Sequence, residues 1–262
     1  MAPDKPSRFW GIASISVLLF AFLALLLMLV PGPLVKADAL SFRTAFDVMR
    51  RAFYLAAGLG IVSFIALTIA ASRANGRTVI RLSGALMLCL IVVSALYMMR
   101  RDAASHVPIH DVTTDLIDPP HFTVIAPRIE DPLIVPDRGR EDLVAVPPDV
   151  RWRIYHKEAY GTLTPLFLDS SVEDAMARAR QAARKMGWEI AHFSVADGRL
   201  EATDTTSWFG FKDDIVVRIR MEKGQSRVDV RSVSRIGISD LGANANRVRH
   251  FLETLSQQGQ NS

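Results

Sequence analysis

Cysteine is almost absent from this chain, and the short motifs of nucleophilic enzymes are missing. The one cysteine among the 262 residues, Cys89, lies inside an apolar run. A single cysteine excludes a disulfide within the chain and a zinc site built from cysteines. The sequence contains no G-x-S-x-G nucleophile elbow and no P-loop. It therefore offers no recognised nucleophile, and we assign no catalytic residue.

Charge of either sign is present without a large excess. There are 31 Lys and Arg against 27 Asp and Glu, a formal net charge of +4 at pH 7. Between Arg151 and Glu253 the count is 17 basic against 14 acidic residues. A nucleic-acid-binding domain concentrates positive charge on one face more strongly than this balance allows. We expect no nucleic-acid partner.

Histidine is scarce as well, with six in the chain. The potential metal ligands that lie close together in sequence are His106, His110, Asp111, Asp115 and His121. Zinc needs three or four ligands converging on a rigid frame, whereas this segment contains Pro108 and no helical H-E-x-x-H pattern. We expect no metal and no other cofactor, and we assign the Asp and Thr side chains here to turns.

Long apolar runs dominate the first hundred residues. Three uncharged runs of 22, 20 and 18 residues cover positions 9–30, 52–71 and 82–99. A helix of about 20 apolar residues crosses the ~30 Å hydrocarbon core of a bilayer. We predict three transmembrane helices that form an anchor over residues 1–101. None has an ionisable residue in its middle, which disfavours a transporter or channel.

The first apolar run is predicted to stay in the protein. Lys5 and Arg8 precede it as in a signal peptide, but the run is longer than a usual signal core and ends at Pro31-Gly32-Pro33. Basic residues flanking the runs number five on one side of the membrane and six on the other. The positive-inside rule therefore leaves the orientation open.

Residues 102–158 are predicted to form a proline-rich arm. Eight prolines lie within the 41 residues from Pro108 to Pro148. This density favours an extended, polyproline-like chain over a long helix, because proline fixes φ and lacks the backbone N–H. Its apolar residues predict that the arm wraps along a folded domain: Phe122, Val124, Ile125, Leu133, Ile134 and Val135.

Residues 159–256 show the patterns of a compact α+β domain. Ser170 and Glu173 form a capping box, and a helical apolar pattern follows from Val172 to Met186. Turn residues then separate four predicted antiparallel strands, at 188–195, 199–208, 213–222 and 226–235.

A final helix is predicted after Ser239 or Asp240, with an apolar stripe from Leu241 to Leu255. Residues 257–262 are predicted to be a disordered tail. The fold class is thus three transmembrane helices, a wrapping arm, and a domain of helix, four-stranded antiparallel sheet and helix.

One long segment has a distinctive sequence: Asp229-Val-Arg-Ser-Val-Ser-Arg-Ile-Gly-Ile-Ser-Asp-Leu-Gly-Ala-Asn-Ala-Asn-Arg247. Together with Ile109–Asp115 and Phe211–Arg218, it resembles the domain of unknown function 1499 family. The resemblance implies a bacterial or plastid envelope protein with no established activity, and it supplies no catalytic residues. Some members resemble exported lipoproteins, although this chain has three spans in place of a lipid-modified cysteine. The resemblance thus favours a multi-pass protein of the bacterial inner membrane with a periplasmic domain.

The candidate site lies on the outward face of the last two strands. Alternation directs several basic residues to this face: Arg218, Arg220, Arg231 and Arg235. Arg247 of the final helix is expected nearby. Guanidinium groups bind phosphates and carboxylates in bidentate fashion, which favours an anionic lipid headgroup or another anionic envelope component as ligand. The alternative is a solvated face whose arginines pair with Glu201, Glu222 and Asp229.

Asn244 lies in the apolar sector of the final helix, where a buried amide must find partners. We interpret it as a polar clamp between this helix and the sheet. Asp213 and Asp214 are adjacent in a strand and face opposite sides, which argues against paired carboxylate catalysis.

The sequence therefore favours a non-catalytic, membrane-tethered binding module. A first alternative is an envelope hydrolase that uses Ser234, Asp240 and Asn244 in the groove beside the final helix. A second alternative is an assembly partner that contacts envelope proteins through its spans.

Overall fold

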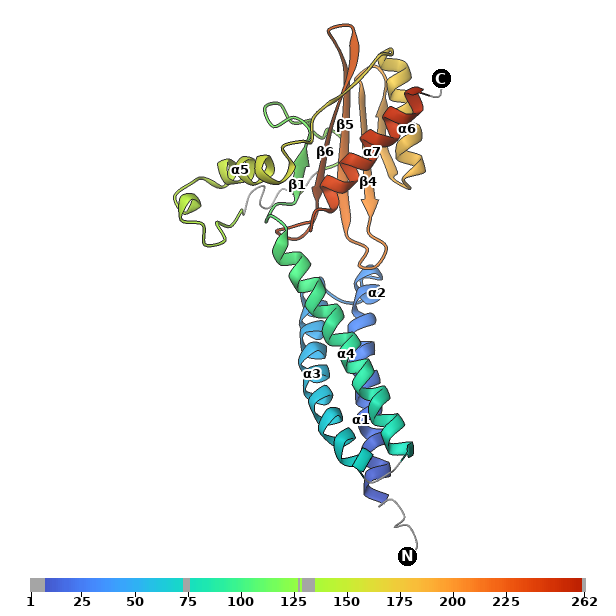
Figure 1. The fold of residues 1–262 in the computed structure, drawn as a ribbon. Helices are drawn as coiled ribbons and strands as arrows, with labels where there is room; N and C mark the ends of the chain where they lie inside the picture. The colour runs from blue at the N-terminus through green and yellow to red at the C-terminus, as the bar shows by residue number, and fades with distance from the viewer. Residues whose placement is uncertain (1–7, 73–75, 127, 129–134, 261–262) are drawn as a thin grey trace, which may run out of the picture. The chain divides into compact units, whose positions relative to one another are not determined.

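The computed structural model describes residues 8–72, 76–126, 128 and 135–260. These residues form two compact units (Figure 1). The first unit runs to Asp102 and includes Ser207–Gly210, while the second contains Ala103–Thr206 and the chain from Phe211 onward. Leu133 and Ile134 of the predicted arm, and the last two residues of the predicted tail, lie outside the described residues.

The first unit is built from helices whose bounds are α1 (Arg8–Leu29), α2 (Pro31–Lys36), α3 (Phe42–Ser72) and α4 (Gly76–Ser105). Three stretches are long and apolar enough to cross a membrane: Phe9–Lys36, Phe42–Ser72 and Gly76–Ser105. Each contains one of the predicted runs, so the prediction of three membrane-length helices is confirmed. α3 and α4 are longer than their uncharged runs, because the charged and polar residues that flank these runs are also helical.

Small side chains line the contacts among these helices. The buried cluster includes Ala21, Ala24, Ala56, Ala85 and Cys89. Small residues let helix backbones approach closely, which favours packing in lipid, where little hydrophobic driving force remains between helices.

The second unit contains a six-stranded antiparallel sheet, two strands more than predicted. The strands are β1 (Asp111–Thr113), β2 (Leu166–Leu168), β3 (Glu189–Ser194), β4 (Arg199–Thr205), β5 (Lys212–Glu222) and β6 (Gln225–Ser234). Their order is β1-β6-β5-β4-β3, and β2 also pairs with β6. The four-strand prediction misses β1 and β2, because three-residue strands carry no periodic pattern of their own.

Helices α6 (Val172–Lys185) and α7 (Ala243–Gln260) cover one face of this sheet (Figure 1). α6 has the predicted helical apolar pattern, and its buried side is mostly alanine: Ala175, Ala179 and Ala183 are fully buried. Its N-cap is Ser171, one residue after the predicted Ser170, and the Ser171 hydroxyl accepts a hydrogen bond from the Asp174 N–H at 3.0 Å. α7 continues through residues 257–260, which were predicted to belong to the tail.

The shared core is apolar on both sides of the helix–sheet interface. Ala245, Val248, Phe251 and Leu255 of α7 are fully buried, whereas Leu241, predicted in the same stripe, is exposed. The Phe251 ring stacks on Trp188 with ring centroids 5.0 Å apart. Leu241 departs from the stripe because it precedes α7, in a turn where its φ is 55°.

The arm is less extended than predicted. It contains a short 3-10 helix, η1 (Glu141–Leu143), and the 13-residue helix α5 (Pro148–Tyr160). Pro148 occupies the first turn of α5, where the missing N–H of proline has no helical partner to lose. The indole of Trp152 donates to the Asp111 carbonyl at 2.8 Å, and the Thr113 N–H donates to the His156 ring at 3.0 Å. These bonds tie α5 to β1.

Two tight turns set the register of the hairpins. Lys223 and Gly224 both have positive φ, 52° and 84°, as a two-residue turn between β5 and β6 requires. Gly198 has a φ of 57° next to β4, and a Cβ there would lie 2.0 Å from the Ile219 carbonyl oxygen. Gly198 is therefore needed both for its φ and for the close approach of the neighbouring strand.

We expect Gly198→Ala to destabilise the second unit more than Gly224→Ala. Both substitutions place alanine at positive φ, which costs about 1–2 kcal/mol. Only the first adds a backbone overlap, which we expect to cost a further ~1–3 kcal/mol. Urea unfolding of the detergent-solubilised chain, followed by tryptophan fluorescence, measures the difference. Equal midpoints for the two variants would contradict the close approach.

Candidate functional site

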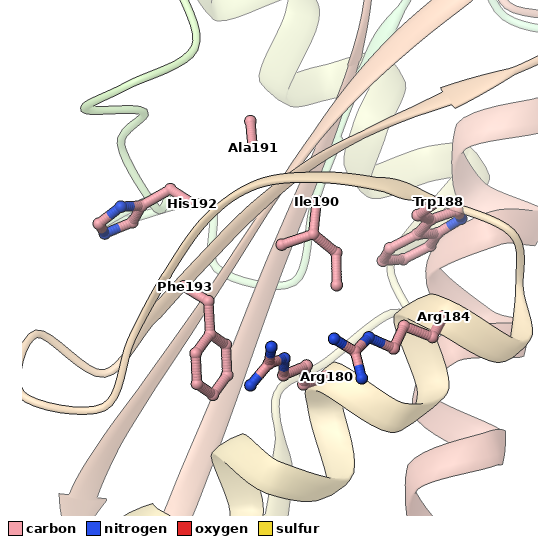
Figure 2. A pocket seen from close by; sticks show the side chains of 7 residues that line it. All are labelled: Arg180, Arg184, Trp188, Ile190, Ala191, His192 and Phe193. Atoms are coloured by element: carbon pink, nitrogen blue, oxygen red, sulfur yellow. The ribbon is translucent and has the colours of Figure 1, made fainter.

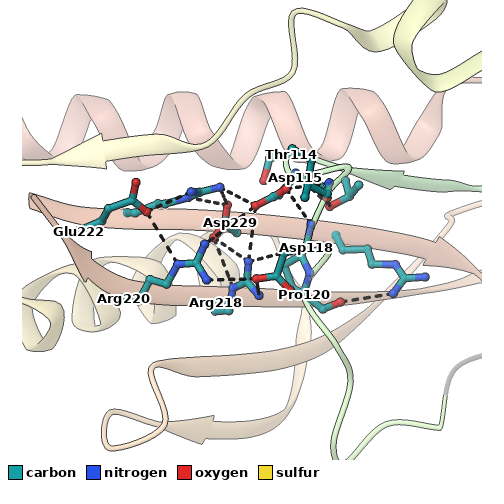
Figure 3. A network of polar contacts seen from close by, with 12 residues as sticks. Thr114, Asp115, Asp118, Pro120, Arg218, Arg220, Glu222 and Asp229 are labelled. Atoms are coloured by element: carbon teal, nitrogen blue, oxygen red, sulfur yellow. Dashed lines mark hydrogen bonds and ion pairs between the residues drawn. The ribbon is translucent and has the colours of Figure 1, made fainter. Parts of the chain in front are cut away.

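Three places in the second unit bring chemically reactive or charged side chains together. The first is a pocket of about 340 Å³ between α6 and β3, which no sequence pattern indicated (Figure 2). The second is a polar network on the sheet face opposite the helices (Figure 3). The third is a buried polar cluster between α7 and the ends of β5 and β6. Each is built from different elements.

The sheet-face network pairs arginines of β5 and β6 with carboxylates. Arg218 donates to Asp229 at 3.0 Å and to Asp118 at 2.9 Å, and Arg220 donates to Asp118 at 3.2 Å (Figure 3). Asp229 is fully buried between strands. A buried carboxylate of this kind is stable only when it is paired and hydrogen-bonded. The arginines therefore neutralise charge that the fold itself has buried.

The arm supplies further carboxylates, in addition to Glu222 of β5, which accepts from Arg227 at 3.0 Å. Asp111 of β1 accepts two parallel hydrogen bonds from Arg231, at 3.0 and 2.6 Å. Asp115, in the loop after β1, accepts from Arg227 at 2.6 Å. The two parallel bonds between Arg231 and Asp111 fix both the distance and the relative orientation of these side chains. The predicted cationic face is thus already occupied by acidic side chains of the same chain.

These loop carboxylates are held in the charged state. Burial would raise the pKa of Asp115, but the N–H groups of Asp118 and Ile117 and the charges of Arg227 and Arg218 lower it overall. The hydrogen bond from Arg220 and the charge of Arg218 lower the pKa of Asp118. Both groups are ionised at neutral pH and oppose a second anion on this face.

Glu201 of β4 binds backbone instead of an arginine, which corrects its predicted role. Its fully buried carboxylate accepts from the N–H groups of Thr123, Val124 and Ile125, at 2.5, 3.0 and 2.7 Å. Burial alone would raise its pKa, but these bonds and the Thr123 hydroxyl lower it. Glu201 therefore fastens a second part of the arm to the sheet.

The buried cluster on the opposite face centres on Asn244. Its carbonyl oxygen accepts from the Ser232 hydroxyl at 2.6 Å and from Arg247 at 2.5 Å. Its amide donates to the His110 carbonyl at 3.0 Å and to the Ser234 hydroxyl at 2.9 Å. Four hydrogen bonds satisfy the hydrogen-bonding capacity of the side chain, and they connect α7 to β6 and to the start of the arm.

Arg247 completes this cluster with two carboxylates. It donates to Asp213 at 2.6 Å and to Asp204 at 2.7 Å, and its side chain is buried. Asp214 points to the other face, where it accepts from Arg235 at 2.8 Å. The two adjacent aspartates therefore face opposite sides of β5, as the alternation predicts.

Asp240 serves the start of α7. Its carboxylate accepts from the N–H groups of Asn244 and Gly242, at 2.8 and 3.0 Å. Burial raises the pKa of Asp240, and the nearby charge of Asp213 adds to the rise, although these hydrogen bonds oppose it. Burial and the charge of Arg128 lower the pKa of His110, which leaves its ring neutral at pH 7.

The eight residues predicted for the site fall into two groups. Those on the arginine face are Arg218, Arg220, Arg231 and Arg235, and those in the buried cluster are Ser234, Asp240, Asn244 and Arg247. The sheet lies between the groups, so they do not make one site. Within the described residues, no three metal-ligating side chains are gathered around a common point.

Asp229 and Glu222, which were predicted as partners of the outward arginines, do pair with Arg218 and Arg227. The pairing of arginines with six further aspartates was not predicted: Asp111, Asp115, Asp118, Asp204, Asp213 and Asp214. A signal for the first two was present, since Ile109–Asp115 is one of the stretches that carry the family resemblance.

We expect Asn244→Ala to destabilise the second unit by about 2–4 kcal/mol, because it leaves buried donors and acceptors without partners. The matched control is Asn246→Ala on the same helix, whose exposed side chain accepts a hydrogen bond from Arg249 at 2.9 Å. The control is expected to change stability by at most ~0.5 kcal/mol. Thermal unfolding of the two variants provides the comparison. Equal, small losses would contradict the clamp.

We expect Glu201→Gln to remove an acid-sensitive part of the stability. Because the folded state lowers the pKa of Glu201, its contribution is present above the ordinary value of 4.5 and is lost as pH falls through the folded value. The wild-type and variant curves of unfolding free energy should therefore converge below that pH. Glu189→Gln, at an exposed position of β3, is the matched control for the loss of one carboxylate from the sheet. A constant offset between the wild-type and Glu201→Gln curves at all pH values would contradict this role.

The similarity of this chain to a known family lies largely in the second unit. The model of a family described as "Protein of unknown function (DUF1499)" matches residues 111–255, which is more than half of the 262 residues. The match begins at the first residue of β1 and ends within α7, so it spans the six strands. No curated protein matches the chain. The chain therefore belongs to the DUF1499 family, which is defined by sequence and not by a known activity.

Proposed function

We propose that this protein is a membrane-tethered, non-catalytic module that binds an anionic component of the cell envelope. Three membrane-length helices support the tether. We place them in the bacterial inner membrane, with the second unit in the periplasm, following the resemblance of some family members to exported lipoproteins.

The proposal that the module is non-catalytic is supported by one observation: the polar groups of the buried cluster already have hydrogen-bond partners within the protein. Asn244 makes four hydrogen bonds within the protein, and Arg247 is held by Asp204 and Asp213. Catalytic groups need free positions for a substrate and for the proton being moved. Side chains committed to one another in this way serve better as a clamp between α7, the sheet and the arm.

The hydrolase alternative receives less support from the same contacts. In the described chain, the Ser234 hydroxyl contacts the Asn244 amide, and no histidine ring or carboxylate lies at hydrogen-bonding distance to activate it. Asp240 is engaged by two N–H groups at the start of α7. A serine nucleophile requires an adjacent base, so this trio lacks the second part of a catalytic pair.

The preference for an anion rests on basic residues outside both networks. Helix α6 carries Arg178, Arg180, Arg184 and Lys185. Within the described residues none of these four forms a salt bridge, in contrast to the arginines of the sheet face. An anion can approach α6 without displacing a carboxylate of the protein itself.

Native mass spectrometry of the full-length chain, extracted from its own membranes in a neutral detergent, tests this function. We expect an anionic species bound in stoichiometric amount, intact, and released as ionic strength rises, because salt screens exposed charge pairs. A preparation that carries no anionic species would contradict the binding function. A bound species recovered as a cleavage product would support the hydrolase instead.

A C-terminal alkaline phosphatase fusion tests the periplasmic placement. We expect the phosphatase fusion to be active. An inactive phosphatase fusion, together with fluorescence from a cytoplasmic reporter fused at the same C-terminal position, would contradict the periplasmic placement.

A further inference from the structure

The pocket between α6 and β3 lies at the open edge of the helix–sheet interface. Among the described strands, β3 is the last of the sheet on this side, and it pairs with β4. The register of this pairing shifts between Ile190 and His192, so Ala191 is an extra residue at the edge. The pocket is lined by Arg180, Arg184, Trp188, Ile190, Ala191, His192 and Phe193.

Two guanidinium groups project from α6 toward this strand, as Figure 2 shows. Arg180 lies over the Phe193 ring, with 4.8 Å between the guanidinium carbon and the ring centroid. Both Arg180 and Arg184 are exposed, and within the described residues neither forms a salt bridge. Their side chains therefore keep hydrogen-bond donors available to an external acceptor.

Besides the two arginines and His192, the pocket is lined by apolar side chains, two of them aromatic, which we call its floor. Trp188 is buried against Phe251, while Ile190 and Phe193 pack partly exposed against the core. A pocket that joins guanidinium donors to an apolar floor matches a ligand with the same two parts. Those parts are an oxyanion that accepts from the arginines and a ring or aliphatic group that covers the floor.

We propose that this pocket is the anion site of the protein and that it binds an organic oxyanion, a phosphate or carboxylate attached to a ring or aliphatic group. The inference rests on the binding function proposed above and gives that function a location. The sheet-face arginines are a weaker site, because Asp111, Asp115 and Asp118 already occupy them. A ligand at Arg180 and Arg184 displaces no internal partner.

The test uses the full-length chain in neutral detergent, with phenyl phosphate as the probe and calorimetric titration as the readout. The pocket variant is Arg180→Gln with Arg184→Gln. The matched control is Arg178→Gln with Lys185→Gln, which removes the same charge from the same helix outside the pocket lining. Both variants change solvent-accessible side chains, and circular dichroism confirms that each one folds.

We expect the pocket variant to weaken phenyl phosphate binding at least tenfold and the control to weaken it less than twofold. Inorganic phosphate, which lacks the ring, should bind the wild type several-fold more weakly than phenyl phosphate. Equal losses in the two variants would overturn the site, because they would reflect net charge alone. The absence of phenyl phosphate binding to the wild type would overturn it as well.

A second arm of the experiment identifies the source of the oxyanion. Mixed micelles that contain phosphatidic acid should bind the wild type and lose affinity in the pocket variant if the natural ligand is a lipid headgroup. If the pocket variant affects only phenyl phosphate, the ligand is a soluble molecule. Either result supports the site.

Failure of the site and failure of the proposed function are distinguishable. If the anionic species that co-purifies with the wild type remains bound in the Arg180→Gln, Arg184→Gln variant, the pocket is not the site and the binding function stands. If the wild type carries no such species, the binding function itself fails.

Discussion

The second unit depends on pairing between arginines of the sheet and carboxylates that the fold buries. Asp229 is fully buried in β6 and is reached by Arg218 and Arg227, at 3.0 Å each. An unpaired carboxylate at this position would be strongly destabilising, since burial removes its hydration. The same arginines then bind Asp115 and Asp118 of the arm. One set of cations therefore satisfies the sheet and holds the arm against it.

A second network, around Asn244 and Arg247, holds elements together on the opposite face of the sheet. Asn244 and Arg247 join α7 to β6, β5 and the residue that precedes β1. The start of β1 is consequently fixed from both sides, by Arg231 on one face and by the Asn244 amide on the other. Polar groups that satisfy one another in the interior make the arrangement specific. They also leave these groups little capacity for a ligand, and this separates the two networks from the pocket beside α6.

Local patterns and long-range contacts explain which features the sequence predicts. The hairpins β3–β4 and β5–β6 and the stripe of α7 follow from alternation and helical spacing, because their determinants lie within a few residues. β1 and β2 escape prediction because each has three residues and a distant partner. The outward arginines and their partners Asp229 and Glu222 in the same hairpin were predictable. Their pairing with the arm was not, since Arg231 and Asp111 are 120 positions apart. Pro148 suggested extended chain, yet at the first turn of α5 it is compatible with a helix.

The most direct test of this account is a double-mutant cycle on Asp111 and Arg231, with Asp111→Asn, Arg231→Gln and the combined variant compared with the wild type by urea unfolding. If the bidentate pair fastens the arm to the sheet, the coupling energy between the two positions should be about 1–3 kcal/mol. Additive losses, with a coupling energy below ~0.5 kcal/mol, would contradict the claim that arginine–carboxylate pairing holds the arm in place.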